Sequence, residues 1–280
     1  MAISAADVKK LRELTDAPMM DCKKALEEAD GDFDKAVQIL REKGASASAK
    51  KAGRATKEGI ARIVLSADRK TGAGIIVECE TDFVSRNDDF KAMVNKLVEG
   101  MLAAGKAGGD VVVDGQSVSD HITEAVGKIR ENIQVRAAEF FTASEGQLAA
   151  YNHHDGKWAS VVTYTGDNAD AAEKVAIQVV AYKPEYLKKE DVPADLIAAE
   201  LATQTKRALD EGKPEEVAKN IAQGRVNKEF YQATVLLEQL IYTDNKTKVT
   251  EFLKQNNGGD VTAYTLLAVG QNAGSEEAEA

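Results

Sequence analysis

The hydrophobic period of the chain changes near Gly59, and this change limits the fold more than any other feature. Before Gly59, apolar residues recur at intervals of three and four, as on one face of a helix; after it, several runs alternate every second residue, as in strands. Strand pairs are in turn followed by helical stretches. This order predicts an α+β fold, and the 280 residues are enough for one large domain or two to three small ones.

Residues 1–44 predict three short helices that pack into a compact docking module. Ser4 followed by Asp7 is typical of a capping box at the start of the first helix. Gly31 is expected to end the second helix and Gly44 the third, because glycine adopts the left-handed conformation at little cost. The second helix has one apolar stripe, formed by Met19, Cys22, Ala25, Leu26 and Ala29.

Met20 departs from this stripe. At 3.6 residues per turn it falls on the polar face with Lys23, Lys24 and Glu27. Two interpretations stay open: a partly covered methionine at a helix start, or an exposed and adaptable contact for a partner protein.

The second block of the sequence shows the order strand–turn–strand–helix twice. The first copy has strands over 60–65 and 74–80 and a helix capped by Asn87. In the second copy, Asp155-Gly156 is typical of a type I′ turn between two strands, and a helix begins near Asp170. We expect two related hairpin-and-helix subdomains that share one body.

The expected organisation has five parts. Residues 1–44 are the docking module and 45–57, which are small and basic, are a linker. Residues 58–141 and 142–270 form the two subdomains of the core. Within the second, residues 184–228 predict two antiparallel helices that project as a hairpin, and residues 271–280 form an acidic tail that we expect to be disordered.

Composition excludes several classes of function. A net charge of −10 disfavours a whole-surface grip on nucleic acid, and fifteen aromatic residues are too few for base-stacking platforms. Two cysteines give no disulfide framework, and the sequence has no apolar run of membrane-spanning length and no secretion signal at its start. We therefore expect a cytoplasmic protein that does not contact nucleic acid or membrane directly.

No motif predicts catalysis, so we expect a binding protein rather than an enzyme, without a cofactor. The glycine-rich phosphate loops and the GxSxG nucleophile motif are absent. His153-His154-Asp155 is the one candidate metal cluster and would suit a metal-dependent hydrolase. On a strand, however, adjacent side chains face opposite ways, so the two histidines would not converge.

The segment from Thr81 to Asn87 links a strand to a helix, and we expect a loop at the edge of the body. It carries the bulky Phe83 beside the acidic Asp82. Phe83 either folds into the core with Val84, the common fate of a lone aromatic residue, or forms a rigidly mounted wedge that inserts into a partner.

Two motifs resemble the signatures of one family. Met19–Leu26 followed by Gly31-Asp32 resembles the N-terminal signature of the bacterial translation elongation factor Ts family, and Thr81–Asn87 resembles its second signature. Further segments that resemble the family are Glu131–Arg136, Tyr151–His154, Lys183–Glu185 and Gly224–Lys228.

The resemblance implies a guanine-nucleotide exchange factor for elongation factor Tu. It implies that the N-terminal module is ubiquitin-associated-like (UBA-like) and docks on the GTPase, with Met19, Met20 and Arg12 in the contact. Asp82 and Phe83 would wedge in beside the magnesium site of the partner, framed by Thr81 and Val84.

The resemblance also assigns the second hairpin and the helical insertion. His153 matches the histidine of a family Tyr-x-His step that touches the GTPase, with His154 as its neighbour. The helical hairpin in 184–228 would correspond to an insertion for dimerisation, as a homodimer contact, or to a coiled-coil insertion. The chief alternative is an interaction protein without exchange activity.

Overall fold

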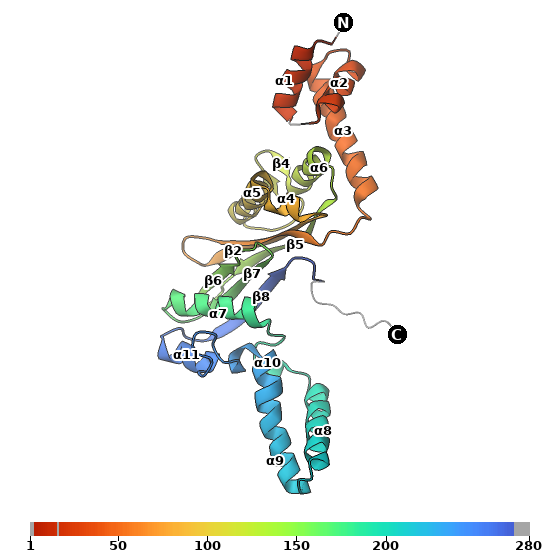
Figure 1. Ribbon diagram of the computed structural model, residues 1–280. Coiled ribbons are helices and arrows are strands. Elements are labelled where there is room, and N and C mark those ends of the chain that lie inside the picture. The colour runs from red at the N-terminus through yellow and green to blue at the C-terminus, as the bar shows by residue number, and fades with distance from the viewer. Residues whose placement is uncertain (1–2, 16, 272–280) are drawn as a thin grey trace.

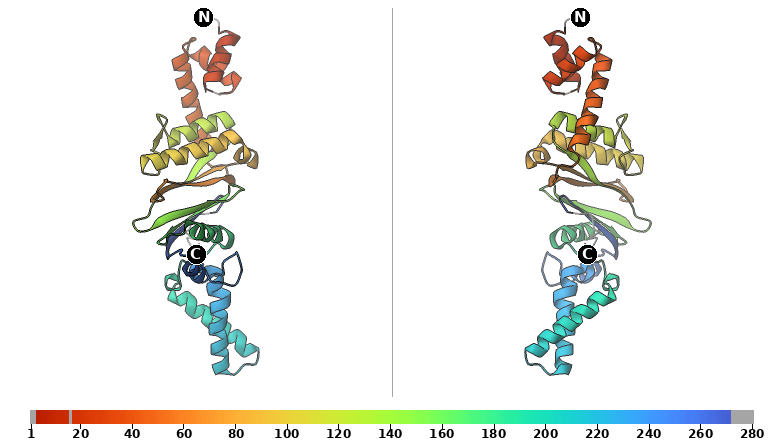
Figure 2. Two further views of the ribbon diagram at one scale, coloured as in Figure 1. Left: turned by 90° about the vertical axis from the view of Figure 1, so that its left-hand side faces the viewer. Right: turned by 90° about the vertical axis from the view of Figure 1, so that its right-hand side faces the viewer.

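The computed structural model describes residues 3–15 and 17–271, which form an elongated molecule (Figures 1 and 2). Helices of the N-terminal module lie at one end, a layered body of sheets and helices lies in the middle, and a helical hairpin projects at the other end. The acidic tail predicted for 271–280 lies, beyond Gln271, outside the described residues. The mixed α+β class predicted from the period change is confirmed.

The N-terminal module contains the three predicted helices. They are α1 (Ala5–Thr15), α2 (Met19–Glu28) and α3 (Phe33–Lys51). The capping box is present, because Ser4 Oγ accepts from the amide of Asp7 while Asp7 Oδ2 accepts from the amide of Ser4, both at 3.1 Å. Gly31 follows α2 with φ of 88°, as predicted. The module has its own small core, formed by Val8, Leu11, Cys22, Ala25, Leu26, Ala29 and Ala36.

Helix α3 does not end at Gly44 as predicted but continues to Lys51. The segment predicted as a linker is therefore helical over its first half. Gly44 is buried where α3 crosses α6 (Val118–Ile129), and a Cβ on Gly44 would lie 3.5 Å from the carbonyl oxygen of Thr123. A glycine that allows a close helix crossing looks, in sequence, like one that ends a helix.

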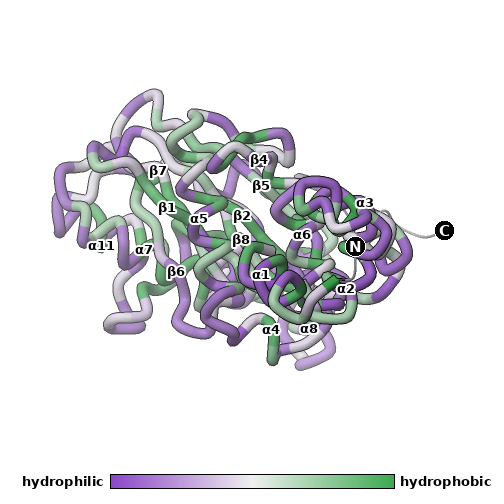
Figure 3. The backbone as a smooth tube through the Cα atoms, turned by 90° about the horizontal axis from the view of Figure 1, so that it is seen from above, coloured by the Kyte–Doolittle hydropathy of each residue, from purple (hydrophilic) through white to green (hydrophobic). Residues whose placement is uncertain are grey.

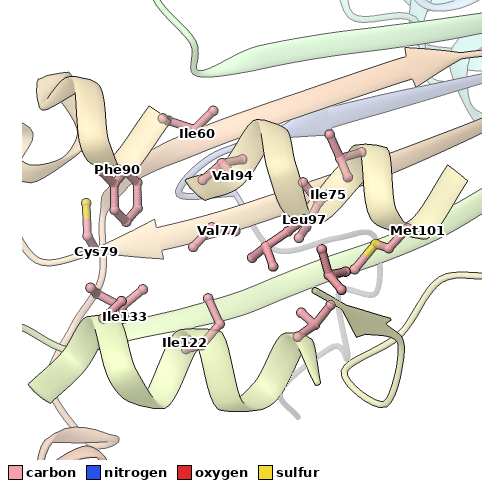
Figure 4. Close-up of a cluster of buried hydrophobic side chains, with 14 of the residues drawn as sticks. Ile60, Ile75, Val77, Cys79, Phe90, Val94, Leu97, Met101, Ile122 and Ile133 are labelled. Carbon is pink, nitrogen blue, oxygen red and sulfur yellow. The ribbon is translucent and has the colours of Figure 1, made fainter. Parts of the chain in front are cut away.

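The upper half of the body is a three-stranded antiparallel sheet under two helices (Figure 1). The strands are β1 (Glu58–Leu65), β2 (Thr71–Cys79) and β5 (Ile133–Thr142), in the order β1-β2-β5. Helices α5 (Asp88–Ala104) and α6 cover its outer face. Figure 4 shows the core between the helices and the sheet, in which Phe90, Val94, Leu97 and Met101 of α5 pack over β1 and β2, while α6 packs against β5.

The lower half repeats this plan with a second antiparallel sheet, ordered β6-β7-β8. Its strands are β6 (Gln147–Asn152), β7 (Trp158–Tyr164) and β8 (Val261–Ala268). Helices α7 (Ala169–Tyr182) and α11 (Val249–Gln255) pack on its outer face around a core that includes the fully buried Tyr164. The prediction of two hairpins, each followed by a helix, is confirmed for these elements.

The inner faces of the two sheets pack on each other, so that the body has the layers helix, sheet, sheet and helix (Figure 1). Ile63 and Ile76 of the first sheet meet Leu148, Val161 and Leu267 of the second. Strand β2 is consequently buried on both faces along nearly its whole length. The residues of β2 that the alternation places away from the helices thus face another sheet, not water.

The predicted helical hairpin is present as α8 (Ala194–Asp210) and α9 (Glu215–Arg225). Pro193 and Pro214 precede the two helices, and Gly212 between them has φ of 80°. The remaining elements are short: α4 (Asp82–Arg86), β3 (Val112–Val113), β4 (Gln116–Ser117), a 3₁₀ turn at Lys189–Asp191, a π-helical turn at Val226–Tyr231, α10 (Gln232–Thr234) and a 3₁₀ turn at Leu236–Glu238. Within residues 3–15 and 17–271, no helix has the length and apolar character needed to cross a bilayer.

Candidate partner-binding surface

The segment predicted as an edge loop is a short helix, α4 (Asp82–Arg86), between β2 and α5. Five residues are too few to show a helical period, so the sequence pattern did not reveal it. Asn87 separates α4 from α5, and its side chain accepts from the amides of Asp89 and Phe90, as a cap should. The capping role predicted for Asn87 is confirmed.

Two neighbouring residues of α4 point in opposite directions. Val84 is only 9% exposed and packs in the core under α5, whereas Phe83 is 84% exposed. The interpretation in which both residues fold into the core is therefore wrong for Phe83. Figure 3 shows α4 at the rim of the molecule when it is seen from above, with part of the helix coloured as hydrophobic. A phenylalanine side chain that does not pack in the core of its own chain is available for contact with a partner.

The ends of α4 are held by polar contacts. Thr81 donates its amide and its hydroxyl to the two carboxylate oxygens of Glu131, at 3.0 and 2.6 Å. Asp82 is half-buried and lies 3.2 Å from the guanidinium of Arg86, one turn further along the helix. Asp82 and Phe83 are thus presented side by side on a helix whose backbone is fixed to the body.

The hairpin between β6 and β7 places the two candidate histidines. Asp155-Gly156 does not form the predicted type I′ turn, because only Gly156 has a positive φ (74°) and a type I′ turn requires two such residues. A longer loop runs instead from His153 to Lys157, closed by the amide of Gly156, which donates to the carbonyl of His153 at 3.0 Å. The carbonyl of Gly156 accepts from Ala61 of β1 at 2.8 Å, which fixes the loop to the first sheet.

His153 and His154 lie beside each other, contrary to the expectation that their side chains diverge. Their ring centroids are 4.2 Å apart, because both residues follow the last residue of β6 and no longer obey the strand alternation. His153 is half-buried, with Nδ1 2.9 Å from the hydroxyl of Tyr151, and His154 is exposed. Across 3–15 and 17–271, no three His, Cys, Asp or Glu side chains are grouped so that they could hold a metal ion.

One depression joins α4 to this hairpin loop. Its lining is mainly charged: Glu58, Ser85, Arg86, Lys91, His154, Asp155 and Lys157. The structure thus brings the end of α4 and the histidine loop to the same edge of the body, although some seventy residues separate them in sequence. Lys157 is paired with Glu58 at 2.8 Å and Lys91 with Asp88 at 3.0 Å, so these cations are already compensated.

A separate apolar surface lies on the N-terminal module, where α1 ends and α2 begins. Met20 is 59% exposed, which favours the interpretation of an exposed methionine. Met19 is exposed too (53%), so its predicted place on the buried stripe is wrong. Leu14 of α1 is 68% exposed and extends this surface. Arg12 is exposed on the last turn of α1.

The two cysteines have the environment of core residues. Burial, with the carboxylates of Glu131 and Glu58 nearby, raises the pKa of the Cys79 thiol to about 12. Burial also raises the pKa of Cys22, which lies in the core of the N-terminal module. Both thiols are therefore protonated at neutral pH and poor nucleophiles.

Comparison with known proteins gives one family. The family model described as Elongation factor TS matches residues 80–271. The chain is 42% identical over 266 residues to elongation factor Ts of Hydrogenobaculum sp. (strain Y04AAS1), covering 92% of this chain and 95% of that protein. It is 42% identical over 293 residues to elongation factor Ts of Nitratidesulfovibrio vulgaris (strain DP4), covering 99% of each chain. With elongation factor Ts of Saccharopolyspora erythraea it shares 43% identity over 279 residues, 96% of this chain and 98% of the other.

Proposed function

Since this chain belongs to the elongation factor Ts family, we propose that it is a guanine-nucleotide exchange factor that binds elongation factor Tu and promotes the release of GDP. The single observation that supports this most is Phe83, which is 84% exposed on a helix that is otherwise anchored in the body. Such a factor works in translation elongation, and hence in the cytoplasm, and makes or breaks no covalent bond.

Exchange follows from thermodynamic linkage. A factor that speeds nucleotide release binds the nucleotide-free GTPase more tightly than the nucleotide-bound form. Conversely, a bound nucleotide lowers the affinity of the GTPase for the factor by the same ratio. Mg²⁺ anchors the phosphates of the nucleotide in a GTPase. A side chain of the factor that displaces the groups around this Mg²⁺ ion in the partner therefore lowers the affinity of the GTPase for GDP.

In this proposal α4 is the wedge. Phe83 supplies a large rigid contact with only two side-chain torsions to restrict, and Asp82 places a negative charge beside it. Thr81 and Val84 frame the pair: Thr81 is hydrogen-bonded to Glu131, and Val84 is packed in the core. The wedge thus stays in position when it is loaded against a partner.

The N-terminal module is the proposed docking element, with the UBA-like arrangement that the family resemblance implies. Met19, Met20 and Arg12 would contact the GTPase, and the exposed Leu14 adds to the same surface. His153 is the proposed contact from the hairpin, since Tyr151 orients its ring, while the exposed His154 adjoins it.

The division into a module (1–44), a connecting segment (45–57) and two core subdomains (58–141 and 142–270) is part of the proposal. The helical hairpin within 184–228 is the proposed homodimer contact. It carries exposed apolar residues on both helices: Leu196, Leu209 and Val217. Sedimentation of the purified chain over a range of concentrations tests this, and a monomer at every concentration would refute it.

Stopped-flow release of fluorescent GDP from elongation factor Tu tests the exchange function. We expect the wild-type chain to accelerate release and Phe83→Ala to lose most of the acceleration. Val112→Ala is the matched control, because Val112 is also exposed (63%) but lies on β3, which packs at the C-terminal half of α5, away from α4. Binding without any acceleration would favour the alternative, an interaction protein without exchange activity.

A further inference from the structure

The short junction between α6 and β5 contacts the two surfaces proposed above. Arg130 forms an ion pair with Asp21 of α2, directly after Met20 in the chain. Glu131 receives both hydrogen bonds from Thr81 at the start of α4. Asn132 is buried, and its side-chain amide donates to the carbonyl of Arg54 at 2.7 Å.

Helix α4 depends on such external contacts. A helix of one turn is not stable by itself, because its nucleation is unfavourable and few internal hydrogen bonds follow. Thr81 stands at its N-cap position without a side-chain capping hydrogen bond, and its hydroxyl donates to Glu131. The one hydrophobic anchor of α4 among the described residues is Val84, so a second contact is needed to prevent rotation about it.

Glu131 provides that contact with favourable chemistry. Both carboxylate oxygens are used, one by an amide and one by a hydroxyl of the same residue, which fixes Thr81 in orientation as well as in position. Glu131 is half-buried, and hydrogen bonds to a charged group are stronger than those between neutral groups. By comparison, the ion pair of Arg130 with Asp21 is exposed and contributes little.

We infer that Glu131 is a positioning residue, which acts through Thr81 to hold α4 so that Phe83 projects in one fixed direction. Glu131 needs no contact with the partner for this role. The inference rests on the proposed function of Phe83 for its effect on GDP release, but its structural part, the fixing of α4, is testable on the isolated chain.

The variants follow from the hydrogen-bond pattern. Glu131→Ala removes both acceptors. Glu131→Gln keeps an oxygen for the amide of Thr81 and offers its NH₂ group to the hydroxyl, so it should restore most of the function. Glu124→Ala is the control, because Glu124 is a carboxylate on the neighbouring α6 that pairs only with Lys128 at 2.8 Å among the contacts described.

The first measurement is amide hydrogen exchange over residues 81–86 in the free protein. Losing a charge-assisted hydrogen bond is expected to speed exchange there roughly tenfold or more in Glu131→Ala, with little change in Glu131→Gln or Glu124→Ala. Protection of 81–86 that stays the same in Glu131→Ala, in a chain whose thermal transition is intact, would overturn the inference. If Glu131→Ala does not fold, Thr81→Val, which removes the hydroxyl donor to Glu131, takes its place; it should speed exchange over residues 82–86 at least a few-fold, and unchanged exchange would overturn the inference.

The second measurement is a double-mutant cycle on GDP release. Glu131→Ala should reduce the stimulated rate about tenfold in the wild-type background and by less than about twofold in the Phe83→Ala background, because it acts through Phe83. An equal reduction in both backgrounds would overturn the inference. If Phe83→Ala itself leaves release unchanged, the wedge of the proposed function fails, whereas the exchange measurement still decides whether Glu131 fixes α4.

Discussion

Gly127 of α6 lies against Gly44 of α3, and a Cβ on Gly127 would stand 3.5 Å from the Cα of Gly44. The two helices therefore cross with their backbones almost in contact. This crossing is the main packing contact between the N-terminal helices and the body. It determines how the module with Met20 stands relative to the sheets.

A larger residue at this crossing should separate α3 from α6. Gly127→Leu cannot fit against Gly44 and is expected to cost about 1–3 kcal/mol or to displace α3. Limited trypsin digestion should then cut faster after Lys50 and Lys51 at the end of α3. Gly127→Ala is the matched control, since its Cβ meets an ordinary contact distance; equal digestion of both variants and of the wild type would contradict the prediction.

Removal of the Met20 side chain should weaken docking without loss of stability. Met20 is exposed, so its truncation leaves no cavity, but a central apolar contact of an interface contributes about 1–2 kcal/mol, or roughly 5- to 30-fold in affinity. Calorimetric titration with elongation factor Tu measures this. Val112→Ala on β3, another exposed apolar residue, serves as the control, and an equal affinity of the two variants would exclude Met20 from the contact.

Substitutions of the neighbouring residues Phe83 and Val84 should differ in their effect on the stability of the fold. Val84→Ala removes two buried carbon atoms, with an expected loss of about 1.5–2 kcal/mol in the free energy of unfolding. Phe83→Ala should change this free energy by less than about 0.5 kcal/mol, because the ring is exposed. Urea unfolding of the two variants gives both values, and a large loss for Phe83→Ala would mean that the ring packs on its own chain in solution.

Ionisation of the Tyr264 hydroxyl should lower the stability of the protein in strong base. Burial, with Glu185 and Asp191 nearby, raises the pKa of Tyr264 from 10 to about 12, and its hydroxyl donates to the carbonyl of Pro184 at 2.7 Å. The folded state thus retains this proton longer than the unfolded state, so the stabilisation is complete below pH 10 and is lost between about pH 10 and 12.

The measurement is the free energy of unfolding against pH for the wild type and for Tyr264→Phe. The difference between the two chains should shrink as the pH rises through this window. A constant difference from pH 9 to 12 would show that Tyr264 does not titrate abnormally in the folded protein.

Elements with many periods were predictable from the sequence. The apolar period of α5 places Phe90, Val94, Leu97 and Met101 on one face, and all four are buried; Pro193, Gly212 and Pro214 bound the two helices of the hairpin. These patterns repeat several times or use residues whose backbone preferences are strong. The local sequence alone is therefore enough to predict these helices.

The errors share a different cause. Gly44 lies inside a helix because Gly127 packs on it, which is a tertiary contact. Met19 has the right phase for the stripe but stands in the first turn of α2, beyond the reach of the module core. The pairing of Thr81 with Glu131 joins residues fifty positions apart, and no pattern in a single sequence indicates it.

The same limit applies to the candidate site. The exposed state of Phe83 was one of two open interpretations, since an aromatic residue beside a valine gives no sign of which one turns inward. His153 and His154 were expected to diverge because the strand was taken to continue, whereas β6 ends at Asn152. Where an element ends decides the direction of the next side chain, and ends are the least determined part of a sequence pattern.

Strand β2 contributes to two cores at once, with Ile75 and Val77 toward the helices and Ile76 toward the second sheet. Heating or urea therefore cannot melt one half of the body and spare the other, and both halves should denature in a single cooperative step. A polypeptide truncated after residue 141 would expose Ile63 and Ile76 to water. Such an exposed apolar sheet surface is expected to cause aggregation.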